Sequence, residues 1–399
     1  MRIALFSDTW LPNVNGVVTS LLNQIKILEQ DGHDVFLFVP RTSVNKLEQV
    51  PDNITVYEFP GVEFPSYPGY KMSLPIGLRR VIKTQKFDIL HSHSPFLQGW
   101  FCMMVKQVQK VPMVTTYHTH LAEYIGHIFK GVGEDHVKHL LNGFTWAFTR
   151  NQYNKYDLIF TPSKVMKLEL EQHGLDPVIE MPNPISSIFL EKQTDVEIRK
   201  KKLRESFKVP KNARVLLYVG RISFEKRLEV LLEAYKNLER KYSDLYLLIV
   251  GDGPQLGMYR KKAKALELQN YIFTGYIHHS QLPIVYQLGD VFISPSDTET
   301  QGLTFIEAMS QGCPVIAIKA RGPSDFIVHN TNGFFSKTLE PSEFEQLIDN
   351  VLQNPEKYES IRKNAVKTAE KYNYDAFRKN LYRGYEEATA RFQEKINKF

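Results

Sequence analysis

Ser294-Pro-Ser-Asp-Thr-Glu-Thr-Gln-Gly-Leu-Thr-Phe-Ile-Glu-Ala-Met-Ser-Gln-Gly-Cys-Pro314 joins two short apolar runs, residues 291–293 and 315–318. The two runs predict buried strands, and the stretch between them predicts a loop followed by a helix that begins near Gly302 and ends at Gly312. The first turn of a helix presents backbone N–H groups without helical partners and the positive end of the dipole. A glycine there lets a ligand approach the backbone. The stretch therefore predicts an anion site.

Two glutamates in this stretch need a separate explanation. Glu299 precedes the expected helix and Glu307 lies about one turn inside it. A carboxylate beside a phosphate site suits ligand hydroxyls better than the phosphate itself. A ligand with a diphosphate, a ribose and a sugar would use all three features. The alternative is that Glu299 caps the helix and Glu307 lies on a solvated face.

The rest of the chain predicts an α/β fold with doubly wound parallel sheets. A strand at residues 3–6, a glycine-bearing loop, a helix at 17–31 and a strand at 34–39 form a βαβ unit. Further strands are expected at residues 55–59, 89–91, 113–116, 158–161, 178–181, 214–220, 245–250 and 271–274. Residues 191–211 are highly charged and predict a linker with an exposed helix between two similar halves. Ser342, with Glu345 three residues on, predicts the capping box of a late helix.

Composition favours two domains in a reducing compartment. The chain has 399 residues, 43% hydrophobic residues, a net charge of +6 and two cysteines without metal-ligand spacing. No apolar run reaches the roughly 20 residues that span a bilayer. We therefore expect a cytoplasmic protein whose contact with the inner face of the cell membrane, where it exists, is peripheral.

A second motif, Gly220-Arg221-Ile-Ser-Phe-Glu225-Lys226, follows a strand and places two cations at its carboxyl end. This motif and the spaced glutamates, with Gly302-Leu303, Glu307-Ala308-Met309 and Gly312-Cys-Pro314-Val-Ile-Ala317, resemble the retaining GT-B glycosyltransferases of family 4. The resemblance implies two Rossmann-like domains facing a cleft. It implies a donor domain at residues 188–374, and an acceptor domain at residues 1–187 to which a C-terminal helix, 375–399, crosses back.

The same resemblance assigns roles to residues of this chain. Arg221 and Lys226 would neutralise the leaving diphosphate, with Glu225 orienting Lys226 through a salt bridge. Glu299 would hold sugar hydroxyls, Glu307 the ribose, and His118 of Tyr117-His118-Thr119 the transferred sugar. Further donor contacts are expected from Gly16, Gln301, Gly302, Leu303 and Thr304. The alternative for His118 is a satisfied core histidine, and for the two cations an ordinary surface loop.

Other histidines invite a metal interpretation that the sequence does not favour. His91 and His93 alternate on an expected strand and would share a face. No carboxylate or cysteine with suitable spacing accompanies them. We expect no metal held by the protein, leave Mg²⁺ dependence open, and assign neither histidine a role.

Residues 71–86 carry five cations and no acid. A helix beginning near Pro75 would place Ile76, Leu78, Val81 and Ile82 broadly on one side, with aromatic anchors upstream at Phe64, Tyr67 and Tyr70. Such a stretch suits an anionic membrane surface, although an ordinary docked surface helix is the alternative. The region resembles bacterial 1,2-diacylglycerol 3-glucosyltransferases.

The sequence thus predicts a retaining hexosyltransferase that uses a nucleotide sugar, UDP-glucose, and a lipid acceptor, diacylglycerol. Alternatives are a soluble sugar or phosphatidylinositol-type acceptor, a UDP-sugar 2-epimerase, and a non-enzymatic nucleotide-sugar binder. No nucleic-acid reader motif accompanies the basic residues.

Overall fold

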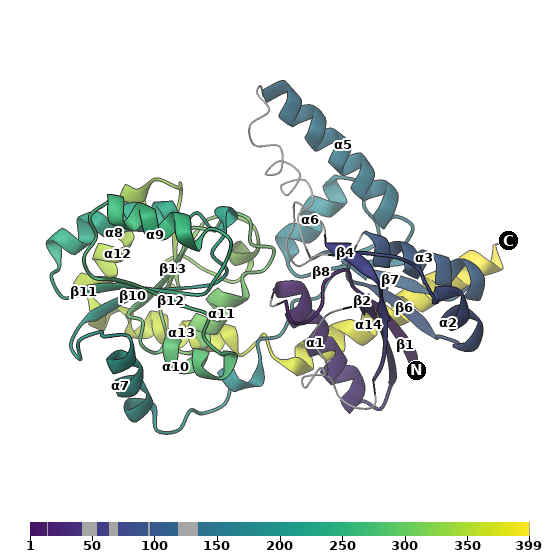
Figure 1. The fold of residues 1–399 in the computed structure, drawn as a ribbon, viewed down its shortest axis with the longest axis horizontal. Coiled ribbons are helices and arrows are strands. Elements are labelled where there is room, and N and C mark those ends of the chain that lie inside the picture. The colour runs from purple at the N-terminus through teal and green to yellow at the C-terminus, as the bar shows by residue number, and fades with distance from the viewer. Residues whose placement is uncertain (14, 42–53, 64–70, 95, 119–134, 399) are drawn as a thin grey trace. The chain divides into compact units, whose positions relative to one another are not determined.

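The structure, a computed structural model, describes residues 1–13, 15–41, 54–63, 71–94, 96–118 and 135–398. The chain divides into two compact units, which are Met1–Pro184 with Tyr374–Phe399 (unit 1) and Ile185–Asn373 (unit 2). Each unit is built on one parallel β-sheet with helices packed against it (Figure 1). No helix in the described ranges combines the length and apolar character that crossing a bilayer requires.

The sheet of unit 1 has the strand order β3-β2-β1-β6-β7-β8-β9. Its strands are β1 (Arg2–Phe6), β2 (Asp34–Pro40), β3 (Thr55–Phe59), β6 (Ile89–Ser92), β7 (Met113–Thr116), β8 (Leu158–Thr161) and β9 (Val178–Glu180). Its helices are α1 (Gly16–Gln30), α2 (Leu78–Thr84), α3 (Leu97–Gln109), α5 (Asp135–Tyr153), α6 (Lys164–Gln172) and α14 (Tyr374–Asn397). An antiparallel hairpin, β4 (Gly61–Glu63) and β5 (Lys71–Ser73), lies outside this sheet. The strand order reverses between β1 and β6.

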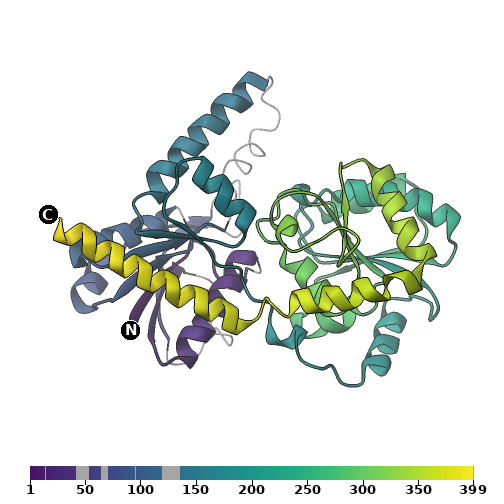
Figure 2. The ribbon, with the colours of Figure 1, turned by 180° about the vertical axis from the view of Figure 1, so that it is seen from behind.

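Burial on both faces of the sheet explains the continuous apolar strands of unit 1. Along β1, Ile3 and Leu5 belong to the core formed with α1 and α14. The alternate residues Ala4 and Phe6 belong to the core formed with α2 and α3. Helix α14, from the end of the chain, thus completes unit 1, along which it runs in Figure 2.

Unit 2 has the strand order β12-β11-β10-β13-β14-β15, which reverses between β10 and β13. Its strands are β10 (Arg214–Val219), β11 (Leu245–Val250), β12 (Tyr271–Gly275), β13 (Val291–Ser294), β14 (Val315–Ile318) and β15 (Phe334–Ser336). Its α-helices are α7 (Val196–Ser206), α8 (Leu228–Lys241), α9 (Leu256–Ala265), α10 (Leu282–Tyr286), α11 (Leu303–Ser310), α12 (Pro341–Gln353) and α13 (Glu359–Ala369). The expected exposed helix between the halves is α7, which has no buried residue.

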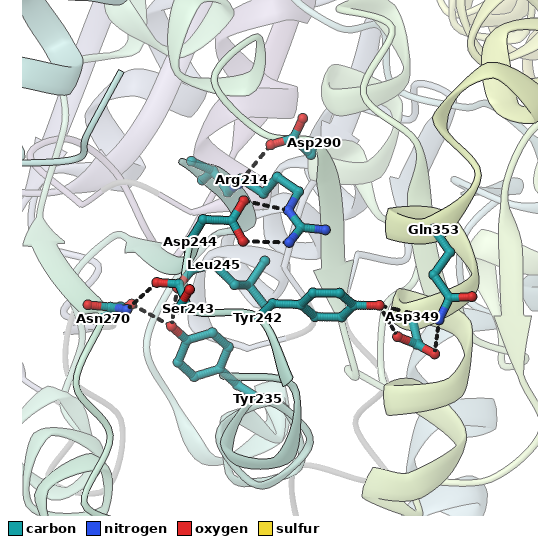
Figure 3. Close-up of polar contacts among 11 residues, drawn as sticks. Arg214, Tyr235, Tyr242, Ser243, Asp244, Leu245, Asn270, Asp290, Asp349 and Gln353 are labelled. Carbon is teal, nitrogen blue, oxygen red and sulfur yellow. Dashed lines mark hydrogen bonds and ion pairs between the residues drawn. The ribbon is translucent and has the colours of Figure 1, made fainter. Parts of the chain in front are cut away.

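Polar side chains fix the amino ends of the unit 2 strands (Figure 3). The Arg214 guanidinium donates to both carboxylate oxygens of Asp244, at 2.8 and 2.5 Å, which ties the start of β10 to the start of β11. The Asp290 carboxylate accepts the backbone N–H of Val215 at 2.7 Å. The Tyr242 hydroxyl donates to Asp349 of α12 at 2.5 Å. This edge of the sheet is occupied by structural contacts, which leaves the carboxyl edge for a ligand.

Two local predictions from the sequence were wrong. Helix α12 begins at Pro341 with Glu340 as its N-cap residue, so Ser342 does not cap it. Proline suits the first helical position because its φ is preset and its missing N–H has no helical partner there. The helix expected near Pro75 begins only at Leu78, after Gly77 with φ +89°. Ile76 therefore lies outside the helix and is 66% exposed.

A close contact between α14 and β8 supports a stability prediction. A Cβ atom added to Gly384 would lie 2.2 Å from the ring of Phe160, which is fully buried. We predict that Gly384→Ala lowers the free energy of unfolding by about 1–3 kcal/mol, because a packed ring cannot give way without strain. Urea denaturation measures this change.

The matched control is Gly143→Ala in α5, where an added Cβ meets no atom within 4 Å. Removing a mid-helix glycine there raises stability by up to about 1 kcal/mol. Equal effects of the two substitutions would contradict the packing assigned to α14.

Candidate active site

The predicted donor residues of unit 2 gather where its strand order reverses. Arg221 and Lys226 follow β10, and Glu299 and Gln301 follow β13, the strand next to β10. Ligands of open α/β sheets bind at the carboxyl ends of the strands at such a switch point. Fold topology therefore brings together two motifs that are more than 70 residues apart in sequence.

Lys226 and Glu299 form the central contact of this group. The Lys226 ammonium lies 2.6 Å from Oε1 of Glu299, and the two side chains are only 21% and 16% exposed. Burial by itself would lower the pKa of Lys226, but the neighbouring Glu299 carboxylate outweighs burial and the pKa is raised. Lys226 is therefore charged, and its contact with Glu299 joins the loop after β10 to the loop after β13.

This contact corrects the partner expected for Lys226. We predicted a salt bridge with Glu225, whereas the Glu225 carboxylate accepts a short hydrogen bond from the Ser223 hydroxyl. Lys226 ends a single 3-10 turn, Phe224–Lys226. That turn directs Lys226 toward Glu299. The preceding Arg221 is fixed through its backbone carbonyl, which accepts from the Tyr218 hydroxyl at 2.9 Å.

The first turn of α11 adds backbone N–H groups to the group. Gly302, its N-cap residue, has φ +88°, which a side chain would strain. An added Cβ would also lie 3.1 Å from Phe305 and 3.2 Å from Pro323. Leu303 and Thr304 are the first residues of the helix, so their N–H groups have no partner within it.

Glu307 lies one turn inside α11 and contacts a residue that the sequence did not single out. The Tyr286 hydroxyl, at the end of α10, donates to Oε2 of Glu307 at 2.7 Å. Burial raises the pKa of Glu307 to about 7, against the opposing effect of this hydrogen bond. The apolar run at residues 282–286 predicts a buried helix. It does not show that the hydroxyl group of Tyr286 points to Glu307.

A second glycine-bearing loop supports the loop after β10. A Cβ on Gly251 would lie 1.9 Å from the carbonyl oxygen of Gly220, and a Cβ on Gly253 would lie 2.2 Å from that of Ile222. Only glycine fits at both positions. The sequence Gly251-Asp-Gly253-Pro after β11 was the available signal for this close packing.

In unit 1, Gly16 begins α1 after β1, beside the second switch point. Asn15 caps the helix, because its side-chain oxygen accepts from the N–H groups of Val17 at 3.1 Å and Val18 at 3.0 Å. A Cβ on Gly16 would meet no atom within 4 Å. Packing therefore does not require glycine here.

His118 follows β7 and lies in a row with His91, which is in β6, and His93, which follows β6. Its Nε2 is 2.8 Å from Nδ1 of His93, and the His93 ring stacks on His91 with centroids 4.4 Å apart. His91 contacts Thr116, Gln24 and Tyr385 at 2.7–3.0 Å. Burial lowers the pKa of all three histidines, so they are neutral at physiological pH. His91 is a satisfied core histidine, whereas His93 positions His118.

Asp8, at the end of β1, is a further buried acid near this row that the sequence did not single out. It accepts the Gln98 N–H at 3.0 Å and a short hydrogen bond from the Ser94 hydroxyl. Burial raises its pKa to about 6. The carboxylate therefore ties the start of α3 to the loop after β1.

The basic segment at residues 71–86 is divided between β5 and α2. The apolar side chains Leu78, Val81 and Ile82 of α2 are buried in the core of unit 1. The three cations of α2, Arg79, Arg80 and Lys83, and Lys86 shortly after it are exposed. The predicted aromatic anchors Phe64, Tyr67 and Tyr70 lie outside the described residues.

Two family descriptions match the chain, Glycosyltransferase Family 4 over residues 14–187 and Glycosyl transferases group 1 over residues 199–368. The alpha-monoglucosyldiacylglycerol synthase of Streptococcus pneumoniae is 32% identical over 329 residues, which cover 79% of this chain and 71% of that protein. The chain belongs to the family 4 glycosyltransferases. The glycosyltransferase is also similar to the alpha-monoglucosyldiacylglycerol synthase of Acholeplasma laidlawii, 28% identical over 408 residues with 100% of both chains covered.

Other comparisons give a relative that is named for a different donor, and solved structures that establish the fold. A GDP-mannose-dependent alpha-mannosyltransferase of Corynebacterium glutamicum is 28% identical, covering 88% of the glycosyltransferase and 81% of that protein. Among solved structures, sucrose-phosphate synthase from Thermosynechococcus elongatus aligns with a TM-score of 0.78 at 19% identity, over 98% of this chain and 99% of that one. Anabaena HepE in complex with UDP and glucose aligns with a TM-score of 0.74 at 19% identity, over 96% and 98%. The glycosyltransferase has the GT-B fold.

The raised pKa of Glu307 predicts how stability depends on pH. An acid whose pKa is higher in the folded than in the unfolded state stabilises the fold fully below its unfolded value, near 4.5, and less as the pH rises through about 7. Glu307→Gln removes this dependence. Between pH 5 and pH 8, the free energy of unfolding of the native protein should therefore fall by about 2 kcal/mol relative to that of the variant. This change is smaller than a fully desolvated carboxylate would give.

Urea denaturation at the two pH values measures this difference. Glu205→Gln, at an exposed position of helix α7, is the matched control and should follow the native protein. A constant gap between the Glu307→Gln variant and the native protein would show that Glu307 titrates normally.

Proposed function

We propose that this glycosyltransferase transfers glucose from UDP-glucose to diacylglycerol with retention of configuration at the anomeric carbon. The Lys226–Glu299 pair beside the first turn of α11 is the observation that carries the donor part of the proposal. The acceptor part is supported by two relatives named alpha-monoglucosyldiacylglycerol synthases, one of them matched over its full length.

The donor would bind at the switch point of unit 2. Lys226, Arg221 and the N–H groups of Leu303 and Thr304 would bind the diphosphate, as positive charges and helix N-termini bind anions. Glu299, held by Lys226, would accept hydrogen bonds from sugar hydroxyls. In this arrangement the lysine serves two partners, since three ammonium donors are available to one carboxylate and one phosphate.

Glu307 would accept the ribose hydroxyls inside α11. A carboxyl group with a pKa near 7 is only partly ionised at neutral pH. Two hydroxyl donors would favour its ionised form, just as the Tyr286 hydroxyl does in the structure. Ribose binding would therefore release a proton near pH 7.

The chemical step would exchange two C–O bonds at the anomeric carbon. The bond to the diphosphate oxygen breaks with its electron pair leaving on that oxygen, while the acceptor hydroxyl oxygen forms the new bond on the same face. The hydroxyl proton passes to the departing diphosphate oxygen. Arg221, Lys226 and the α11 amides would stabilise the charge that develops on the diphosphate. No side chain is assigned as a covalent nucleophile.

In unit 1, His118 would position the transferred sugar. Its ring is held by the contact with His93, and its pKa is lowered, so it would act as a neutral hydrogen-bonding group rather than as a proton donor to the leaving group. Gly16, at the exposed start of α1, would leave room for the donor near the backbone.

A lipid acceptor requires contact with a membrane surface. The exposed cations of α2, with no acid in residues 71–86, support binding to anionic lipid headgroups at the inner face of the cell membrane. The buried apolar side of α2 means that this helix would contribute charge rather than apolar insertion.

GDP-mannose is the second candidate donor, because relatives with 28–30% identity are named GDP-mannose-dependent alpha-mannosyltransferases. Both donors contain a diphosphate and a ribose, so the residues that we assign to these groups would serve either donor. The base and the sugar hydroxyls must decide between them.

Transfer of radiolabelled glucose from UDP-glucose into mixed micelles of diacylglycerol and anionic lipid tests the proposal. We expect label in the lipid phase that depends on diacylglycerol, with the α-anomeric configuration by NMR. Transfer from GDP-mannose but not UDP-glucose would replace the donor. Label released only as free glucose, with no lipid product, would contradict the acceptor.

A further inference from the structure

The outer face of helix α3 is apolar along its whole length. Phe96, Trp100, Met104 and Val108 are spaced four residues apart and are 46%, 56%, 39% and 65% exposed. The opposite side of the helix, including Phe101, Cys102 and Val105, is buried in the core of unit 1. We call the four exposed residues the α3 outer face; from first to last they span about 18 Å along the helix.

This face lacks the charges that normally cover an exposed helix. Between Phe96 and Gln109, Gln107 is the one exposed polar residue that the structure describes. Lys106 is turned away, because its ammonium lies 2.7 Å from the buried carboxylate of Asp157 and over the ring of Phe392. Single exposed apolar residues are ordinary, but an uncharged row of four indicates a contact surface.

The surroundings of the α3 outer face add further apolar residues and cations. Helix α3 contacts both α2 and β5, and α2 and α3 lie side by side in Figure 1. On and after the β4–β5 hairpin, Val62, Met72, Leu74 and Ile76 are 38–66% exposed. On α2 the exposed charged residues are Arg79, Arg80 and Lys83, and the exposed Lys86 follows the helix.

Glu63 lies opposite Lys71 in the β4–β5 hairpin, and Asp88, which follows the basic segment, accepts the backbone N–H of Arg2 at 2.7 Å. The combined surface is thus apolar and basic, with aromatic and aliphatic side chains at one helix and cations at its neighbour. An anionic bilayer offers the matching chemistry, since acyl chains accept apolar side chains and headgroups accept cations. A second copy of the chain fits less well, because an isologous contact would bring the α2 cations of both copies to one interface.

We propose that the α3 outer face inserts into the lipid leaflet while the α2 cations bind anionic headgroups. This proposal rests on the proposed lipid acceptor. It also gives that acceptor a route, because α3 starts at the carboxyl edge of the unit 1 sheet, four residues after His93. The inserted end of the helix would hold this edge, with His118, at the membrane surface where diacylglycerol lies.

Trp100 is an intrinsic probe for the test. The chain has three tryptophans. The other two, Trp10 and Trp146, are 1% and 7% exposed. We expect the fluorescence of the native protein to shift to shorter wavelength on adding vesicles of phosphatidylcholine and phosphatidylglycerol, and to be quenched by lipids brominated along the acyl chain. Trp100→Phe should abolish both changes.

A double variant tests the α3 outer face without relying on the fluorescence of Trp100. Met104→Glu with Val108→Glu should lower the affinity for the vesicles at least tenfold by sedimentation. The matched control is Leu168→Glu, on α6, where the replaced residue is also exposed, at 49%. It should bind vesicles as the native protein does. Circular dichroism and Tm establish that each variant is folded.

Three outcomes would overturn the proposal. These are absence of vesicle binding, vesicle binding that leaves Trp100 emission unchanged, and an emission shift that depends on protein concentration in the absence of lipid. The last outcome would indicate self-association. Failure of the proposed function is separate. If Trp100 inserts but the enzyme does not glucosylate diacylglycerol, the membrane face stands and the acceptor is wrong. Transfer to detergent-dispersed diacylglycerol by the Met104→Glu, Val108→Glu variant would show an intact active site.

Discussion

The ion pair between Lys226 and Glu299 is the contact on which the site in unit 2 depends. Its 2.6 Å separation and low exposure mean that neither charge could remain there alone without a large desolvation cost. The pair also holds together two loops that come from neighbouring strands on opposite sides of the strand-order reversal. A ligand that needs both a cation and a carboxylate therefore meets them already placed, and little reorganisation is required when it binds.

The amino ends and the carboxyl ends of the unit 2 strands carry different kinds of contact. At the amino ends, Arg214, Asp244 and Asp290 tie the strand starts to one another through charged hydrogen bonds. At the carboxyl ends, the loops carry Lys226, Glu299 and the first turn of α11, and glycines such as Gly251 and Gly253 allow these loops to pack closely. Rigidity at the amino edge fixes the positions of the loops at the carboxyl edge. Unit 1 repeats the plan, with His118 and Gly16 at its own carboxyl edge.

Much of this could be predicted from the sequence, because buried parallel strands are short apolar runs and the motifs lie directly after them. Strands at residues 55–59, 113–116 and 158–161 were predicted with their observed bounds. The choice of partner could not be predicted. That Lys226 pairs with Glu299 rather than Glu225, and that Tyr286 meets Glu307, depends on strand order and loop direction. The one cation of α3, Lys106, lies against Asp157 rather than on the outer side, so the sequence gave no sign that Trp100 is exposed.

Turnover of Lys226→Ala, measured beside the native enzyme with UDP-glucose and diacylglycerol micelles, tests whether the Lys226–Glu299 pair serves the donor site. We predict a loss in kcat on the order of 10²–10³-fold, equivalent to about 3 kcal/mol of lost stabilisation of the leaving diphosphate. Circular dichroism and Tm should show that the variant stays folded. Normal turnover by a folded Lys226→Ala protein would contradict the role of the ion pair and move the donor site elsewhere.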